Sequence, residues 1–356
     1  MKPLSKEHLA TLDKADMLGR VLAMPEHFRE SLARAQRVEL KIDAASLNGI
    51  VIVGMGGSAM SGDVARGLAL DALALPLQVS RSYELPGWVN ERSLVIVSSY
   101  SGNTEESLAA FQMAQARAAK IICITSGGKL NAFAQQNNLP VFSLPPGFPP
   151  RSALAHLTVP LLMILHRLGL TPDPANDINE TSALLEKLGQ TWGVEVDTPN
   201  NLAKNVAHAL TLRLPIIYAA CGLFEVAAWR WKEQFCENAE ILSWHNAFPE
   251  LNHNELVGWG LRRALDQNLQ VIYLRDRQDY VRVQKRMEVS RELIAQSSAP
   301  VIEVWSEGHS LLARLFSLIF LGDLASVYLA VLNGVDPTPV KKIDLLKERL
   351  EQFHVA

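Results

Sequence analysis

The chain has 356 residues, a length that favours two domains over three. Its residues are 48% hydrophobic and 20% charged, a composition that excludes intrinsic disorder and a fibrous repeat. The net charge of −3 argues against a general binder of nucleic acids or anionic membranes, because such proteins need a concentrated basic surface.

The N-terminus and the cysteines bear on where the protein works. Met1–Glu7 lacks the apolar segment of a secretory signal. Apolar stretches such as Leu214–Phe224 are shorter than the roughly 20 residues that cross a bilayer. The three cysteines, Cys123, Cys221 and Cys236, have neither the number for a disulfide framework nor the spacing of a zinc site. We therefore expect a cytoplasmic protein without a membrane partner.

The first half of the chain alternates apolar strands with helices. Residues 1–45 are expected to form an amphipathic helical arm. After it, buried strands are expected at Gly49–Val53, Leu77–Ser80, Leu94–Ser98 and Ile121–Thr125, and helices at 60–70 and 105–119. This alternation predicts a parallel sheet with right-handed crossovers.

A second series of strands and helices follows. The proline-rich segment Leu144–Pro150 precedes a long apolar helix over 151–168, and residues 170–182 have the composition of a linker. Beyond it, strands are expected at Leu214–Ala220, Leu269–Leu274 and Val301–Trp305, and helices at 224–236, 279–296, 309–333 and 343–353. The sequence thus predicts an α/β protein with an N-terminal arm over 1–45, one domain over 46–170 and another over 183–356.

A glycine-rich turn, Gly54–Ala59, follows the first predicted strand and fits the pattern G-x-G-x-x-A. Such a turn lets backbone N–H groups at a helix N-terminus face an anion. A dinucleotide site would also need a carboxylate at the end of the second strand, and that strand ends at Ser80-Arg81. An NADP site could use Arg81 instead, so an NADP-dependent oxidoreductase remains one alternative.

The end of the third predicted strand is rich in hydroxyl groups. Ser99, Ser101 and Thr104 lie within six residues, beside Gly102 and just before a helix. An ordinary helix cap needs only one hydroxyl. Several neutral donors at a helix N-terminus suit a phosphomonoester, so phosphate binding is favoured over capping alone.

These two turns together resemble the sugar isomerase (SIS) domain, which binds phosphosugars. The whole chain resembles the bifunctional phosphoglucose/phosphomannose isomerases, and the resemblance extends through Pro149–Ala153, Asn252–Glu255 and Ile343–Lys347. It implies two doubly wound, flavodoxin-like SIS domains with flanking helices, a homodimer, and no cofactor. It also implies that glucose 6-phosphate and mannose 6-phosphate are interconverted with fructose 6-phosphate through a cis-enediol. It places the substrate phosphate on Gly57, Ser58, Ser99, Ser101 and Thr104.

The resemblance implies catalytic residues as well. Glu237, which has apolar neighbours at a predicted helix end, matches the family's general base, and Arg151 is expected near the reacting carbons. His253 matches a histidine that opens the sugar ring from across the dimer interface. Lys347 is the best match to the catalytic lysine of the last helix, and Lys342 is the fallback. The resemblance also suggests that Thr338 leaves room beside C3 of the sugar.

Two further readings of the sequence stay open. His245, His253, Glu250 and Glu255 could be read as a metal cluster, but they lack a ligand spacing such as H-x-x-x-H, so no metal is expected. The other reading is a non-catalytic phosphosugar-binding regulator. It would keep the serine and threonine site without needing Glu237, His253 and Lys347 together.

Overall fold

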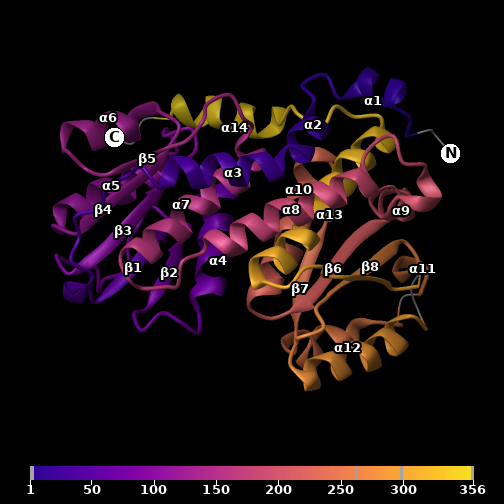
Figure 1. The fold of residues 1–356 in the computed structure, drawn as a ribbon. Helices are drawn as coiled ribbons and strands as arrows, with labels where there is room; N and C mark the ends of the chain where they lie inside the picture. Colours follow the sequence, from indigo (N-terminus) through magenta and orange to yellow (C-terminus); the bar gives the residue numbers. More distant parts are fainter. Residues whose placement is uncertain (1–3, 262, 297–299, 354–356) are drawn as a thin grey trace.

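The computed structural model describes residues 4–261, 263–296 and 300–353. Its two halves each contain a parallel β-sheet, and Figure 1 shows the two sheets side by side, with helices around and between them. The strand order is β2-β1-β3-β4-β5 in the first sheet and β7-β6-β8-β9 in the second. The first order is that of flavodoxin-like folds, and the second repeats it with one strand fewer. The predicted α/β fold with two doubly wound parallel sheets is confirmed.

The seven strands expected from the sequence are present, each with bounds within one residue of the prediction. The strands are β1 (Gly49–Val53), β2 (Leu77–Ser80), β3 (Ser93–Ser98), β4 (Lys120–Thr125), β5 (Val141–Ser143), β6 (Leu214–Ala220), β7 (Trp244–Phe248), β8 (Leu269–Arg275) and β9 (Ile302–Trp305). The sequence analysis missed β5 and β7. Both lie at sheet edges, and neither is a continuous buried apolar run, which is the signal that revealed the other strands.

Helices cover both sheets and form the N-terminal arm. They are α1 (Lys6–Leu12), α2 (Met17–Leu22), α3 (Met24–Ala35), α4 (Gly57–Ala69), α5 (Glu105–Ala116), α6 (Gly128–Gln136), α7 (Leu154–Arg167), α8 (Ala175–Trp192), α9 (Leu202–Ala209), α10 (Leu223–Asn238), α11 (Arg263–Asp266), α12 (Val281–Ile294), α13 (Leu311–Asn333) and α14 (Lys341–Glu351). Short 3-10 turns include η2 (Pro150–Ser152), η4 (Glu250–His253) and η5 (Glu255–Gly258).

The expectation of a linker over 170–182 was wrong from Ala175 onward, where α8 begins. Polar residues and two prolines at the start of this segment concealed the helix. Its buried side chains Ile178, Leu185 and Leu188 follow a helical spacing and pack into the core, where α8 contacts α3 and α13. The domain boundaries themselves remain predictions.

Helix α13 runs through the core of the second half. It is the one described helix long and apolar enough to cross a membrane, so the expectation that apolar stretches are too short was wrong. The helix is buried along its length and packs on α8, α9 and α10. It also carries Asp323, which forms a buried ion pair with Arg230 of α10. These contacts identify α13 as the core helix of a globular protein.

Helices α4 and α10 line the contact between the halves and position the functional residues. A Cβ on Gly67, in the last turns of α4, would lie 2.7 Å from the Leu223 side chain at the start of α10. At the other end of α4, a Cβ on Gly57 would lie 3.1 Å from the Pro150 carbonyl oxygen. The beginning of α4 therefore sits against η2, the turn that contains Arg151.

Candidate active site

Two strand ends meet at the switch point of the first sheet, where the chain order reverses between β1 and β3. Open parallel sheets bind their ligands at this position. Ser58 follows β1 in the first turn of α4, and Ser99 directly follows β3. Thr104 lies at the N-terminus of α5, and its hydroxyl is 2.9 Å from that of Ser99. The structure therefore gathers hydroxyls and two helix N-termini at one sheet edge.

The loop that carries these hydroxyls requires its glycine. Gly102 has φ +68°, and a Cβ there would lie 1.9 Å from the Gly127 carbonyl oxygen. Its N–H donates to the Ser99 hydroxyl at 3.1 Å, which holds the turn closed. The backbone can thus fold back on itself between Ser99 and Thr104, whose hydroxyls meet.

The structure does not show these hydroxyls acting as ordinary caps of α5. Thr104 is the N-cap residue of α5, but its side chain makes no capping hydrogen bond. The exposed Ser101 accepts the Asn103 N–H at 3.2 Å, which closes the turn before the helix rather than capping it. The first-turn N–H groups of α5 therefore keep their capacity to bind an anion.

Arg151 is the point at which three separate segments meet. This buried side chain donates from Nε to the Asn238 amide oxygen at 2.6 Å and from Nη2 to the carbonyl oxygens of Pro337 and Thr338, each at 2.7 Å. Its remaining nitrogen, Nη1, lies 3.6 Å from a carboxylate oxygen of Glu237. Burial lowers the pKa of Arg151, and the charge of Glu237 opposes that shift. The guanidinium is thus fixed with one end turned towards Glu237.

Further buried polar groups fix Asn238 and the backbone of Arg151 in place. The amide nitrogen of Asn238 donates to Ser326 at 2.9 Å, which fixes the orientation of that amide. Arg230 donates to the backbone carbonyl of Arg151 and is itself paired with Asp323 through two hydrogen bonds of 3.0 and 2.8 Å. The sequence analysis did not find Asn238, although it directly follows the predicted base. Its position next to Glu237 on α10 was the available signal.

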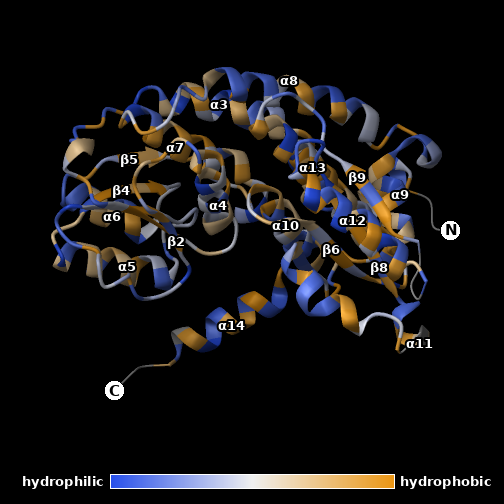
Figure 2. Cartoon of the chain, turned by 90° about the horizontal axis from the view of Figure 1, so that it is seen from below, coloured by the Kyte–Doolittle hydropathy of each residue, from blue (hydrophilic) through white to orange (hydrophobic). Residues whose placement is uncertain are grey.

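The structure does not bring all four predicted catalytic residues together. Glu237 and Arg151 are neighbours, and the Glu237 side chain is 29% exposed. His253 is exposed at the end of η4. Lys347 and Lys342 are exposed on α14, which stands apart from both sheets in Figure 2. Within the described residues, none of these last three forms a hydrogen bond or ion pair with Arg151 or Glu237.

The second sheet carries a different side chain at its own switch point, between β6 and β8. The chain after β8 continues with Asp276 in place of a serine, and this carboxylate is fully buried. It accepts hydrogen bonds from Ser306 and from the Gln278 backbone, and Arg314 lies 3.5 Å away. A carboxylate of the chain itself thus occupies the edge where the first half presents neutral donors.

Several residues that an NADP site or a metal site would need interact with other side chains instead. Arg81, which an NADP site would use, pairs with Asp63 and lies 4.2 Å from the ring centre of Trp229. His245 stacks on the same tryptophan at 5.5 Å. Glu255 accepts hydrogen bonds from Tyr218 and Asn246. Over the described parts of the chain, no three histidine, cysteine or carboxylate side chains converge as metal ligands.

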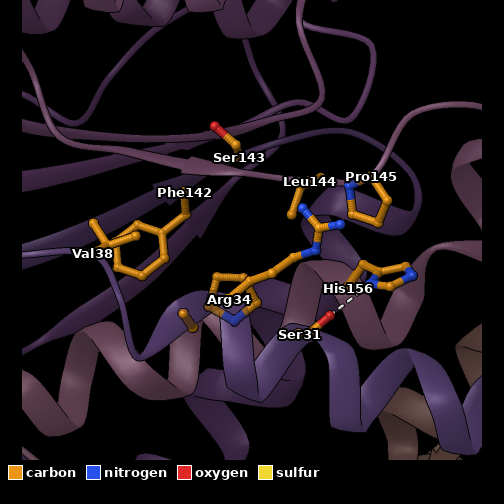
Figure 3. A pocket seen from close by; sticks show the side chains of 10 residues that line it. Ser31, Arg34, Val38, Phe142, Ser143, Leu144, Pro145 and His156 are labelled. Atoms are coloured by element: carbon orange, nitrogen blue, oxygen red, sulfur yellow. Dashed lines mark hydrogen bonds between the residues drawn. The ribbon is translucent and has the colours of Figure 1, made fainter.

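A small cavity beside the first sheet is separate from this site. Figure 3 shows it between β5, α3 and α7, where His156 contacts Ser31 at 2.6 Å from Nδ1 to Oγ. Its volume of about 20 Å³ has room for one water molecule but not for a sugar. Burial lowers the pKa of His156 to about 3, so this imidazole is neutral at physiological pH.

Comparisons with known proteins identify relatives of this chain. The model of the SIS domain matches residues 45–139, and that of the bacterial phospho-glucose isomerase C-terminal SIS domain matches 199–350. A bifunctional phosphoglucose/phosphomannose isomerase of Caldicellulosiruptor bescii is 43% identical, over 95% of this chain and 99% of its own. One from Aquifex aeolicus is 34% identical, over 87% and 92%. A solved structure of a hypothetical protein from Thermus thermophilus is 15% identical and superposes with a TM-score of 0.74, over 98% of this chain and 92% of that one.

Proposed function

Because the chain belongs to the bifunctional phosphoglucose/phosphomannose isomerase family, we propose that it interconverts glucose 6-phosphate and mannose 6-phosphate with fructose 6-phosphate. The observation that carries the proposal is the pair of Arg151 and Glu237, 3.6 Å apart and next to the hydroxyl-rich edge of the first sheet. A carboxylate beside a fixed guanidinium can move a proton on carbon while the neighbouring oxygens gain negative charge.

In the proposed reaction, the hydroxyls of Ser58, Ser99, Ser101 and Thr104, with Gly57 leaving room for close approach, bind the phosphate. His253 and Lys347 then open the sugar ring by moving a proton between the ring oxygen and the C1 hydroxyl. Glu237 removes the proton from C2 and returns it to C1 through a cis-enediol, while the hydroxyl proton on O2 passes to O1, so no proton is gained or lost. Arg151 stabilises the negative charge that develops on the enediol oxygens.

The same route accounts for activity on both aldose 6-phosphates. Glucose 6-phosphate and mannose 6-phosphate differ only in configuration at C2, and removal of the C2 proton abolishes that difference. One base serves both if the sugar can turn about its C2–C3 bond. Thr338 is our candidate for the small residue beside C3, since its carbonyl is bonded to Arg151.

We also infer a homodimer in which His253 acts on the partner's site. Within one chain His253 is exposed, and in the described residues it forms no hydrogen bond or ion pair with Glu237. Helix α14 supports a dimer too, because Ile343, Leu346 and Leu350 form an apolar stripe at helical spacing that is exposed in one chain. A subunit interface would bury this stripe and could bring Lys347 to a site. We place the enzyme in the cytoplasm.

A coupled assay of the purified protein tests the proposal. Both aldose 6-phosphates should be converted to fructose 6-phosphate, and EDTA should leave the rates unchanged. Conversion of glucose 6-phosphate alone would remove mannose 6-phosphate from the proposal. Binding of phosphosugars without turnover of either would favour the regulator, and a change in NADPH fluorescence on mixing would favour the oxidoreductase.

A further inference from the structure

His253 lies in the loop after β7, between Asn252 and Glu255, whose side chains are hydrogen-bonded to other elements. The loop contains η4 and η5, and a dense run of polar side chains over residues 250–255. Asn254 donates to Glu250 at 2.9 Å and accepts the Glu255 N–H at 2.6 Å, so the loop is also bonded to itself. Asn252 and Glu255, by contrast, reach outside the loop.

Asn252 connects the loop to α12. Its amide nitrogen donates to the Ser290 hydroxyl at 2.8 Å, and Arg286 approaches its amide oxygen at 3.4 Å. Ser290 is buried. A groove of about 390 Å³ lies beside this contact, lined by Asn252, Leu256, Arg282, Lys285, Arg286, Val289 and Ser290. Leu251 of the loop and Met287 of α12 belong to one buried apolar cluster, and the hydrogen bonds of Asn252 add a directional contact between the same two elements.

Glu255 connects the other side of the loop to the second sheet. Its carboxylate accepts the Tyr218 hydroxyl from β6 and the Asn246 amide from β7. Tyr218 is fully buried, and burial together with the charge of Glu255 raises its pKa. This phenol therefore stays protonated and keeps donating to the carboxylate over the whole working pH range.

We propose that Asn252 and Glu255 are positioning residues. They fix the direction in which the His253 side chain projects from the surface, and this direction determines how fast His253 opens the sugar ring. The inference rests on the role proposed above for His253. The neighbours of this histidine are tied to α12 and to the sheet, whereas its own side chain is exposed. Preorganisation of this kind removes the cost of ordering a catalytic side chain when substrate binds.

The test measures ring opening apart from isomerisation. In a Glu237→Gln background, exchange between the α and β anomers of glucose 6-phosphate still requires ring opening, and NMR exchange spectroscopy measures its rate. Asn252→Ala and Ser290→Ala should each slow this exchange about tenfold, the effect of roughly one lost hydrogen bond. The double variant should be no slower than either single one, because both remove the same contact.

Controls separate positioning from folding. Ser290→Thr keeps the hydroxyl and should restore exchange, and Lys285→Ala, which lines the same groove without contacting Asn252, should leave exchange unchanged. Wild-type exchange in both Asn252→Ala and Ser290→Ala would overturn the positioning role, and so would additive losses in the double variant. Undiminished exchange in His253→Ala would instead overturn the proposed ring opener itself. Loss of exchange in that variant alone would leave the ring opener standing and refute only the positioning role.

Discussion

Replacing Asn238 by alanine tests the arrangement around the reacting carbons. The amide oxygen of Asn238 accepts the Arg151 Nε–H at 2.6 Å in a buried site. A hydrogen bond to a charged group contributes roughly 1.5–3 kcal/mol, which corresponds to about ten- to hundredfold in rate. Because Arg151 is proposed to act on charge that develops only in the transition state, kcat and kcat/KM should fall by the same factor. KM for glucose 6-phosphate should change little, since the phosphate is proposed to bind at the hydroxyls of the first sheet.

Steady-state kinetics on both aldose phosphates, with thermal unfolding of each variant, measures this effect. Asn333→Ala is a matched control, because Asn333 donates to the Ala239 carbonyl at the end of the same helix without touching Arg151. That control should keep wild-type kcat. A kcat within about twofold of wild type for a folded Asn238→Ala variant would refute the reasoning. A rise in KM at unchanged kcat would do so too, since it would assign the amide to substrate binding.

Three further outcomes are expected. Glu237→Gln keeps the shape of the side chain but removes the proton acceptor, so turnover should fall by several orders of magnitude while the affinity for a phosphosugar inhibitor, measured by calorimetry, stays similar. Ser101→Ala with Thr104→Ala should raise KM by about tenfold or more, as two donors to the phosphate are lost, and an unchanged KM would place the phosphate elsewhere. His156, whose pKa burial lowers to about 3, stays neutral in the folded state while the unfolded chain takes up a proton below about 6.5. Stability should therefore fall between pH 6.5 and 3, by up to roughly 1.4 kcal/mol per pH unit, and urea unfolding should show a flatter profile for His156→Gln.

The fold could be predicted where a buried element corresponds to a continuous apolar run in the sequence. β1 and β3 are buried on both faces and were visible as apolar runs. The edge strand β7 has only five residues and is buried only at its last two, so its signal is weak. Helix α8 was hidden by the prolines just before it and by the polar residues in its first turns. The local composition of this segment does not show that the distant helix α13 packs against α8.

The site was predictable in part for a similar reason. The hydroxyl cluster from Ser99 to Thr104 is local in sequence, so the proximity of these side chains could be predicted directly. The pairing of Arg151 with Glu237 joins residues 86 positions apart, and only the family resemblance suggested it. The carbonyl oxygens of Pro337 and Thr338 that hold Arg151 belong to the backbone, which has no side-chain signature. The anchoring of the His253 loop also depends on contacts between separate elements.

The difference between the two halves bears on how charge is distributed in the proposed reaction. The first half presents hydroxyls and helix N-termini to the phosphate, all formally neutral donors. At the matching edge of the second half lies the buried carboxylate of Asp276, which accepts hydrogen bonds from the chain itself. Arg151 lies between the halves, and three hydrogen bonds hold it so that Nη1 faces Glu237. In the proposed complex these neutral donors, and not Arg151, bind the phosphate, so the guanidinium is not paired with the ligand's permanent charge. Its field is then directed at the charge that appears only as the enediol forms, which is the interaction that increases turnover rather than binding.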